Sequence, residues 1–291
     1  LQSRGLGDVY KRQDLLHTMT DSRRYLSFET IQAYFHPSDG SAASAVVQAE
    51  GKYGVIGLDG EYLLEPEYED AGVLGSGYFP VCQDGEYFYV DKNAYRRKVP
   101  DYAVTWLGSF SEGYAPFQQG ETNADGSKAD NAGKYGYLDV NLNHIVAAYD
   151  YAGGFYHDRA AVQQDGKWML IDKEFQQVGS ESFAEILVDE NGFCSQHGVF
   201  WAKVGDCYYL YNLDAQRISE TGFSSVKLFA SEQPCAVQLA DGSWGFINKD
   251  GTVQDALTYA DAESYCLGYA PVQPEDSGWR LVDPQGMYML E

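Results

Sequence analysis

An aromatic residue recurs along this 291-residue chain at nearly regular intervals, and this periodicity restricts the fold more than any other feature. The successive intervals are 34, 48, 33, 40, 36 and 35 residues, and the long second interval contains an insertion. Self-similarity of this kind is typical of proteins built from stacked repeats. The seven aromatic anchors are Tyr53, Tyr87, Tyr135, Trp168, Tyr208, Trp244 and Trp279.

Two further positions recur around each anchor. A glycine lies two residues before the anchor in five copies, at Gly51, Gly85, Gly133, Gly166 and Gly242. An Asp or Asn lies four residues after the anchor in six copies, where its short side chain can accept hydrogen bonds from backbone amides and so set a turn. These turn residues are Asp91, Asp139, Asp172, Asn212, Asn248 and Asp283.

The sequence around the fourth anchor predicts a β-meander. Asp165-Gly166 separates two strand-like runs, and this dipeptide is typical of a tight hairpin because glycine adopts a positive φ without steric cost. A third strand is expected after Asp172, and the Tyr/Phe-x-x-Ala step that follows, as in Tyr68–Ala71, is a candidate fourth strand. Anchor strands such as Trp244–Ile247 are apolar on both faces, so neighbouring repeats must cover each other.

We therefore expect an all-β protein whose seven tandem β-meander repeats, each of about 35 residues, close into a β-propeller-like ring. An open β-solenoid is the alternative arrangement of the same units. Residues 27–291 are expected to form a single repeat domain. Phe28–Phe35 could complete the last repeat as a non-local strand that closes the ring, whereas the competing prediction is a helix through Asp14–Tyr34.

Residues 1–26 are expected to form a separate N-terminal segment. Its opening residues, 1–13, resemble a translated cloning adaptor, and we predict that they are not native. The native start, with any signal peptide or lipid anchor, would then lie outside this sequence. The sequence accordingly predicts no particular cellular compartment.

The composition is strongly acidic, with a formal net charge of −23 at pH 7. This charge argues against nucleic acid as a partner, because binding a polyanion requires a basic face. It also argues against docking on an anionic membrane, and the chain lacks an apolar run long enough for membrane insertion. The one basic cluster, residues 96–98, is expected to lie on a solvated strand edge.

The sequence lacks the common motifs of nucleophilic, phosphate-binding and zinc-dependent catalysis. Its five histidines and five cysteines do not show metal-ligand spacing, so neither a metal nor a cofactor is expected. A glycosidase pair could be present among the carboxylates outside the recurring positions, although the pattern does not select one. These carboxylates are Glu65, Glu67, Glu69, Asp70, Glu185, Asp189 and Glu190. We predict that the protein is not an enzyme.

The insertion before the third anchor, residues 119–132, is polar and is expected to form a flexible surface loop. An insertion on one face of a repeat protein can also decorate a binding surface. Several tyrosines near turns could line a groove for protein or sugar contacts, because a rigid ring supplies contact area at low entropy cost. These are Tyr102, Tyr149, Tyr151 and Tyr156.

The repeats resemble the WG-repeat family of bacterial proteins, whose unit has a Gly-Lys-Trp-Gly core followed by an apolar pair and Asp. The nearest matches are Gly51–Gly54, Gly133–Gly136, Gly166–Trp168 and Ser243–Gly245, and the resemblance covers residues 45–291. It implies a structural repeat of the kind found in interaction proteins and carries over no catalytic residue. We expect a non-catalytic scaffold that binds a protein; the alternatives are a carbohydrate-binding module and a carboxylate-dependent glycoside hydrolase.

Overall fold

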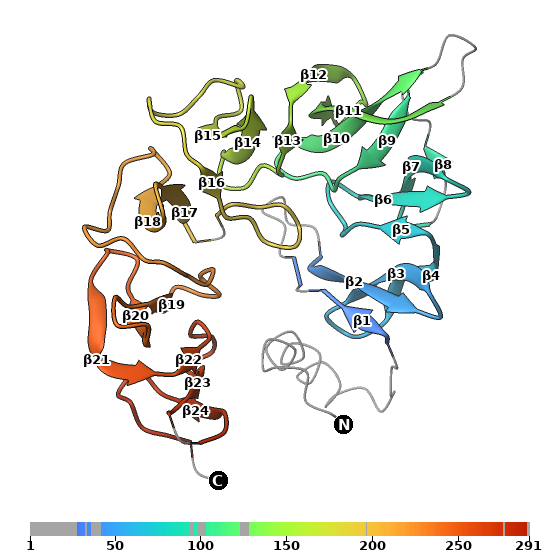
Figure 1. Cartoon of the computed structure of the whole chain (residues 1–291). Coiled ribbons are helices and arrows are strands. Elements are labelled where there is room, and N and C mark those ends of the chain that lie inside the picture. Colours follow the sequence, from blue (N-terminus) through green and yellow to red (C-terminus); the bar gives the residue numbers. More distant parts are fainter. Residues whose placement is uncertain are drawn as a thin grey trace. The chain divides into compact units, whose positions relative to one another are not determined.

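The computed structural model describes residues 28–32, 34–35, 42–93, 96–97, 103–122, 128–195, 197–275 and 277–289. These residues form strands and turns without a helix, which confirms the all-β prediction. The strands belong to seven small antiparallel sheets that follow one another along the chain (Figure 1). The adaptor-like residues 1–13 lie outside the described residues.

The chain divides into two compact units, so a single domain over residues 27–291 stays a prediction. The first unit ends at Gly166 and also includes Glu190–Phe193. Its strands are β1 (Thr30–Ile31), β2 (Ser44–Ala49), β3 (Lys52–Gly57), β4 (Tyr62–Tyr68), β5 (Asp70–Ala71), β6 (Tyr78–Gln83), β7 (Glu86–Asp91), β8 (Arg96–Arg97), β9 (Val104–Leu107), β10 (Tyr114–Thr122), β11 (Lys128–Asp139), β12 (His144–Tyr149), β13 (Tyr151–Ala152) and β14 (Ala160–Gln164).

The second unit holds Lys167–Asp189 and the chain from Cys194 onward. Its strands are β15 (Lys167–Ile171), β16 (Glu185–Ile186), β17 (Val199–Val204), β18 (Cys207–Asn212), β19 (Cys235–Gln238), β20 (Trp244–Ile247), β21 (Val253–Tyr259), β22 (Asp261–Ala262), β23 (Ala270–Gln273) and β24 (Arg280–Val282).

The aromatic-x-x-Ala step joins each sheet to the next one. Tyr68, the aromatic residue of one step, pairs with the anchor Tyr53 in β3, whereas Asp70–Ala71 pair with Cys82 and Val81 in the following sheet. The short strand at the end of the step therefore opens the next repeat rather than closing its own. The fourth strand was predicted correctly, but it belongs to the next sheet.

The proposed ring-closing role of Phe28–Phe35 is wrong. β1 pairs with β2 of the first repeat, through Thr30 with Gln48 and Ile31 with Val47. The segment thus occupies the position that Glu185–Ile186 occupies in the fifth repeat, where β16 pairs with β17. The competing helix is also wrong where the structure describes it, because residues 30–31 are extended; residues 14–27 lie outside the described part.

The antiparallel order gives each repeat two distinct ends. In the sheet β5-β6-β7-β8, the β6–β7 hairpin and the aromatic steps lie at one end, which we call the hairpin end. The β5–β6 and β7–β8 connections lie at the opposite end, which we call the turn end, because successive antiparallel strands reverse direction. Residues at the same end of neighbouring repeats can therefore meet.

The hydrophobic core lies between adjacent sheets. In the first unit, Val46 and Val55 of the first repeat cluster with Phe79 and Val81 of the second, and all four are buried. In the second unit, buried side chains of the fifth repeat, including Trp201, pack in the same way on those of the sixth. Each sheet therefore depends on its neighbour for burial, as the two-sided apolar anchor strands predicted.

In three repeats, a second glycine directly after the anchor accommodates a β-bulge in the outer strand, which is the strand that follows the anchor strand. A Cβ on Gly54 would lie 2.6 Å from the Leu64 carbonyl oxygen, and one on Gly136 would lie 1.7 Å from the Val146 oxygen. The register of β3–β4, β11–β12 and β20–β21 shifts at these positions. In the fourth and fifth repeats, where Met169 and Tyr209 replace this glycine, the aromatic residue of the step makes only an isolated bridge to the anchor.

Candidate functional site

Six of the seven anchors lie at or just before the start of the third strand of their repeat, whereas Tyr135 lies inside β11, which continues into the insertion. Most of them are half-buried and only Trp244 is buried, while the residues two or three positions later are fully enclosed. Five anchors lie opposite the aromatic residue of the following step. These pairs are Tyr53 with Tyr68, Tyr135 with Tyr149, Trp168 with Phe183, Tyr208 with Phe223 and Trp244 with Tyr259.

Two tyrosine anchors donate hydrogen bonds to carboxylates of the short strand of the same sheet. The Tyr87 hydroxyl lies 3.0 Å from Asp70 Oδ2, and the Tyr208 hydroxyl lies 2.6 Å from Glu185 Oε2. Burial, together with the nearby carboxylate, raises the pKa of Tyr208 to about 12 and raises the pKa of Tyr87 as well. These carboxylates therefore act as acceptors that hold the anchors in place.

Carboxylates that directly follow the aromatic residue of a step hold the hairpin of the next repeat. Glycine amides at the hairpins donate to them, at 3.2 Å from Gly51 to Glu29, 3.0 Å from Gly85 to Glu69 and 3.3 Å from Gly166 to Asp150. The amide of Gly85 lowers the pKa of Glu69. Lys134, from the Gly-Lys-aromatic core of the third repeat, forms an ion pair with Asp150. The core lysine, the step carboxylate and the hairpin glycine thus connect successive repeats.

The recurring Asp and Asn residues act at the turn end. Asp139 Oδ1 accepts hydrogen bonds from the amides of Asn141 and Asn143, both at 2.8 Å. The same oxygen of three further turn residues accepts from the amides two and four positions ahead, and Asp91 accepts from Asn93. The three residues are Asp172, Asn212 and Asp283. Asn248 accepts instead from the Gln254 side chain, at 3.1 Å.

Acid should weaken the Asp139 turn. Partial burial opposes ionisation of Asp139, but hydrogen bonds from Asn143 and Asn141 outweigh it and lower the pKa. A carboxyl whose pKa is lowered by folding stabilises the protein above about pH 4 and loses this effect as the pH falls through its folded value. In urea unfolding, we expect the free energy of unfolding of wild type to exceed that of Asp139→Asn at pH 7, and the difference to narrow as the pH falls below about 4. A pH-independent gap would contradict this account.

Glu112 connects the turn ends of the third and fourth repeats. Its Oε1 accepts from the His157 amide and its Oε2 from the Asp158 amide, both at 2.8 Å. His157 and Asp158 both have positive φ values, 54° and 59°, so their two N–H groups point to one concave site that suits a carboxylate. In the second unit, Gln233 Oε1 accepts from the Gly268 amide of the seventh repeat at 2.8 Å.

Replacing Glu112 by alanine should reduce the free energy of unfolding by about 1–2 kcal/mol, because two backbone donors lose their acceptor. Glu112→Gln retains one accepting oxygen, as Gln233 does naturally, and should cost about half as much. Urea unfolding and amide exchange at His157 and Asp158 measure the effect. Equal stabilities for the alanine and glutamine variants would show that the side-chain oxygens do not hold this turn.

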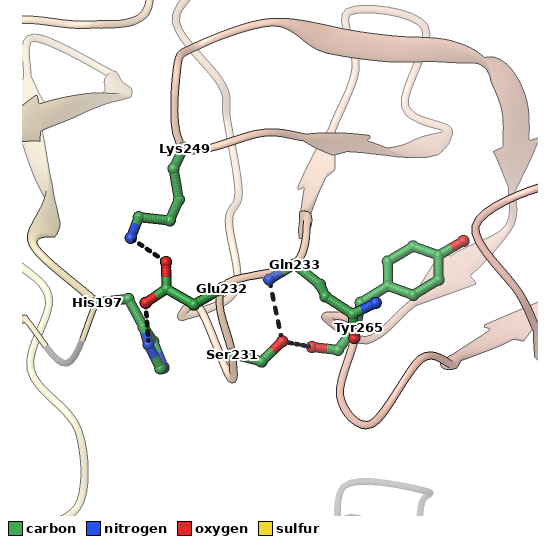
Figure 2. Close-up of polar contacts among 6 residues, drawn as sticks. All are labelled: His197, Ser231, Glu232, Gln233, Lys249 and Tyr265. Carbon is green, nitrogen blue, oxygen red and sulfur yellow. Dashed lines mark hydrogen bonds and ion pairs between the residues drawn. The ribbon is translucent and has the colours of Figure 1, made fainter.

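A second polar cluster occupies the turn end of the fifth to seventh repeats, within the second unit. Figure 2 shows Glu232 between His197 and Lys249, with its Oε1 3.2 Å from His197 Nδ1 and its Oε2 2.6 Å from Lys249 Nζ. The side chain of Glu232 is 73% exposed, and the Lys249 ammonium lowers its pKa. Ser231 Oγ donates to the Tyr265 carbonyl at 2.8 Å. The cluster joins three repeats through side chains that solvent reaches.

The candidate groove tyrosines are largely used in packing. Tyr149 is buried, and Tyr156 packs against Phe35 and Phe193 with ring centroids 6.1 and 5.6 Å away. Tyr151 is half-buried next to the Tyr135 ring, at 5.8 Å. Tyr102 lies outside the described residues.

The other candidate groups are placed as follows. Among the described residues, no group of three or more His, Cys, Asp or Glu side chains could hold a metal ion. Cys82, Cys194 and Cys235 are buried, and none of the five cysteines, all of them described, forms a disulfide. Of the basic cluster, Arg96 and Arg97 form β8 at the edge of the second sheet, and Lys98 lies outside the described residues.

The insertion before the third anchor is not the flexible loop that was expected, as far as the structure describes it. β10 and β11 continue into it, and they pair at Gly120 with Ala132 and at Thr122 with Lys128. The insertion therefore forms a two-stranded β-ribbon that extends the hairpin end of the third repeat (Figure 1). Polar residues can form this ribbon because the hydrogen bonds between its strands join backbone groups and do not require apolar side chains.

Comparison with known proteins supports the architecture. The dihydro-heme d1 dehydrogenase NirN is 11% identical over 91% of this chain and 67% of its own, with a TM-score of 0.52. A eukaryotic initiation factor is 11% identical over 86% and 73%, with a TM-score of 0.51. Hsv2 of Kluyveromyces lactis is 11% identical over 87% and 89%, with a TM-score of 0.46. The likeness to NirN, a β-propeller-like fold, shows a fold of that class; an open solenoid stays the alternative.

The family resemblance is confirmed by direct comparison. A model of the WG containing repeat matches residues 53–87 and 135–168, so the chain carries repeats of this family. No curated protein matches the sequence significantly. Within the described part of the chain, no helix has the length and apolar character needed to cross a membrane. The matched repeats and the fold together indicate a module of tandem β-repeats.

Proposed function

We propose that this chain is a non-catalytic interaction module that binds a protein partner. One observation carries the proposal: the recurring polar side chains make hydrogen bonds within the fold. Two anchor hydroxyls, three step carboxylates and the turn Asp or Asn residues bond to neighbouring strands or turns of the described repeats. The positions that repeat thus support the scaffold, and recognition falls to features that differ between repeats.

The carboxylates also support a non-catalytic role. A glycosidase needs one carboxyl group with a raised pKa beside a second one that stays ionised. Of the carboxylates singled out from the sequence, Glu69 has a lowered pKa and accepts hydrogen bonds from a hairpin amide. Asp70 and Glu185 accept from anchor tyrosines. These three groups therefore have structural partners that account for their positions.

A carbohydrate-binding module is the alternative, and the geometry of the aromatic rings favours a protein partner instead. Trp106, Tyr135 and Tyr151 form a row of half-buried rings in the first unit. The interplanar angles are 57° and 43°, so the rings are tilted against one another and do not form the flat platform that stacks on sugars.

Two parallel experiments test the proposal. The whole purified chain is immobilised, proteins from lysate of the source cells are captured and quantified, and the enriched protein is purified and titrated against the chain. The same chain is applied to a glycan array. We expect saturable binding of one protein and a silent array. Selection of a defined glycan, with no protein enriched over an unrelated acidic β-protein, would overturn the proposal.

A further inference from the structure

The β-ribbon of the third repeat extends beyond its neighbouring strands. On one side, the pairing of β9 with β10 ends at Val104 and Gln119, followed by one bond from the Gly120 amide to the Ala103 carbonyl at 2.9 Å. On the other side, the pairing of β12 with β11 ends at Tyr149 and Tyr135. Among the described residues, only β10 and β11 pair with each other beyond these points, and both have an outer edge there.

The ribbon is an addition to a repeat that does not need it. In the fourth repeat the sequence Gln163-Gln164-Asp165-Gly166-Lys167 makes the complete hairpin, with a positive φ at Asp165 and Gly166. The third repeat has the same Gln-Gln and Gly-Lys pairs, but residues 120–132 replace the single Asp. The outer edge of β11 over residues 128–133 is roughly 20 Å long, enough to pair with a peptide of six residues.

Charge selects the class of segment that this edge can accept. Residues 120–132 contain Glu121, Asp125 and Asp130 against Lys128, and the whole chain carries a net charge of −23. A second copy of this chain would bring a similar negative charge to the same edge, which opposes self-pairing. A basic extended segment is attracted to it and satisfies the open backbone groups by adding a strand.

We propose that the β11 edge over residues 128–133 binds an extended, lysine- or arginine-bearing segment of the protein partner by β-strand addition. The inference rests on the proposed function and specifies the surface and the chemistry of the partner. The ladder hydrogen bonds supply affinity that depends little on sequence, and the acidic surroundings select basic side chains.

Peptide binding tests the inference. The probe is a ten-residue peptide of alternating Lys and Thr, and its control carries a methyl group on every backbone amide nitrogen, which keeps the charge but removes the N–H donors of both strand edges. Both are titrated by fluorescence anisotropy into the whole chain and into a variant with residues 120–132 replaced by one Asp, as in the fourth repeat. We expect the Lys-Thr peptide to bind wild type at least tenfold more tightly than it binds the shortened variant, and the N-methylated peptide to bind both proteins weakly. Equal affinity of the two proteins, or of the two peptides for wild type, would overturn the inference.

Two point variants guard against misfolding of the shortened chain. Successive amides of a strand point to opposite edges, so one of Asp130→Pro and Asn131→Pro removes a donor from the open edge and leaves the β10 pairing in place. That variant should lose the peptide affinity while keeping wild-type unfolding in urea. If both variants bind like wild type, the edge does not add a strand.

The lysate capture separates this inference from the proposed function. Retention of the protein partner by both wild type and the shortened chain would overturn the ribbon inference and leave the interaction module standing. Loss of the partner from the shortened chain alone would support both. A wild-type chain that captures no protein would overturn the proposed function itself.

Discussion

Replacing Gly136 by alanine should lower the free energy of unfolding by about 3 kcal/mol, because the added Cβ has no space. It would lie 1.7 Å from the Val146 carbonyl oxygen and 2.7 Å from the Ala147 Cα, both on the backbone of β12. A backbone atom cannot rotate away as a side chain can, so the β-bulge that passes over Gly136 must open. Urea unfolding, with amide exchange over β11 and β12, measures the loss.

The matched control is Gly85→Ala. Gly85 has a positive φ of 71°, and a Cβ there would meet nothing within 4 Å. Its substitution should cost only the backbone strain of about 1 kcal/mol. A Gly136→Ala variant no less stable than Gly85→Ala would show that the second glycine of the repeat does not accommodate the outer strand.

Truncation of Trp201 should have the largest effect in the second unit, about 3–5 kcal/mol for Trp201→Ala. The side chain is 1% exposed and lies between the fifth and sixth repeats. Its ring stacks on Phe229 at 6.3 Å and meets Phe223 edge to face at 6.0 Å. The alanine variant removes one of the largest fully buried side chains among the described residues and leaves a cavity between two sheets.

Trp201→Phe is the control for size. It keeps an aromatic ring in contact with Phe229 and should retain more than half of the lost stability. Amide exchange should accelerate most over β17–β20 in the alanine variant, because the two sheets depend on each other for burial. Amide exchange that accelerates equally over β2–β7 would contradict the claim that the hydrophobic core consists of local clusters, each between two adjacent sheets.

The repeat pattern was sufficient to predict the hairpins, but the strand expected after Asp172 was wrong, because only isolated bridges of Gln177 with Ile171 and of Phe183 with Trp168 lie there. Asp-Gly dipeptides, as at Asp84-Gly85 and Asp165-Gly166, mark hairpins because their φ values are positive there, and the sequence alone shows this requirement. Two-sided apolar strands predicted stacking of the sheets. The repeat period could not predict which sheet contains the short strand at the end of each aromatic step, because both neighbouring sheets offer an apolar strand for pairing. The role predicted for Phe28–Phe35 was wrong for this reason.

The contacts between repeats were harder to predict. Glu112 and Gln233 each accept a hydrogen bond from a backbone amide in a turn of the next repeat. The two residues are of different amino-acid types, so the position does not stand out as a recurring one. Phe193 stacks on Phe35 at 4.6 Å across 158 positions of sequence, and no periodic pattern marks it. The roles of the step carboxylates Glu69 and Asp150 could have been predicted from the sequence, since each directly follows the aromatic residue of a step.

The extended ribbon forms from a polar sequence that lacks the alternation typical of strands. The composition of residues 119–132 indicates a loop, because apolar alternation is missing. Ladder pairing nevertheless continues to Thr122 and Lys128, since the preceding strands already fix the register and direction of the hairpin. The ribbon therefore presents an unpaired backbone edge among the described residues, whereas the recurring polar side chains make hydrogen bonds within the repeats.

Amide hydrogen exchange of the whole chain, alone and saturated with the captured protein, tests the central claim most directly. If the chain is an interaction module that binds through the third repeat, exchange should slow over residues 118–135 and change little in β2–β7 and β17–β24. Unchanged exchange over residues 118–135 in a saturated complex, with slowing confined to other repeats, would contradict the account.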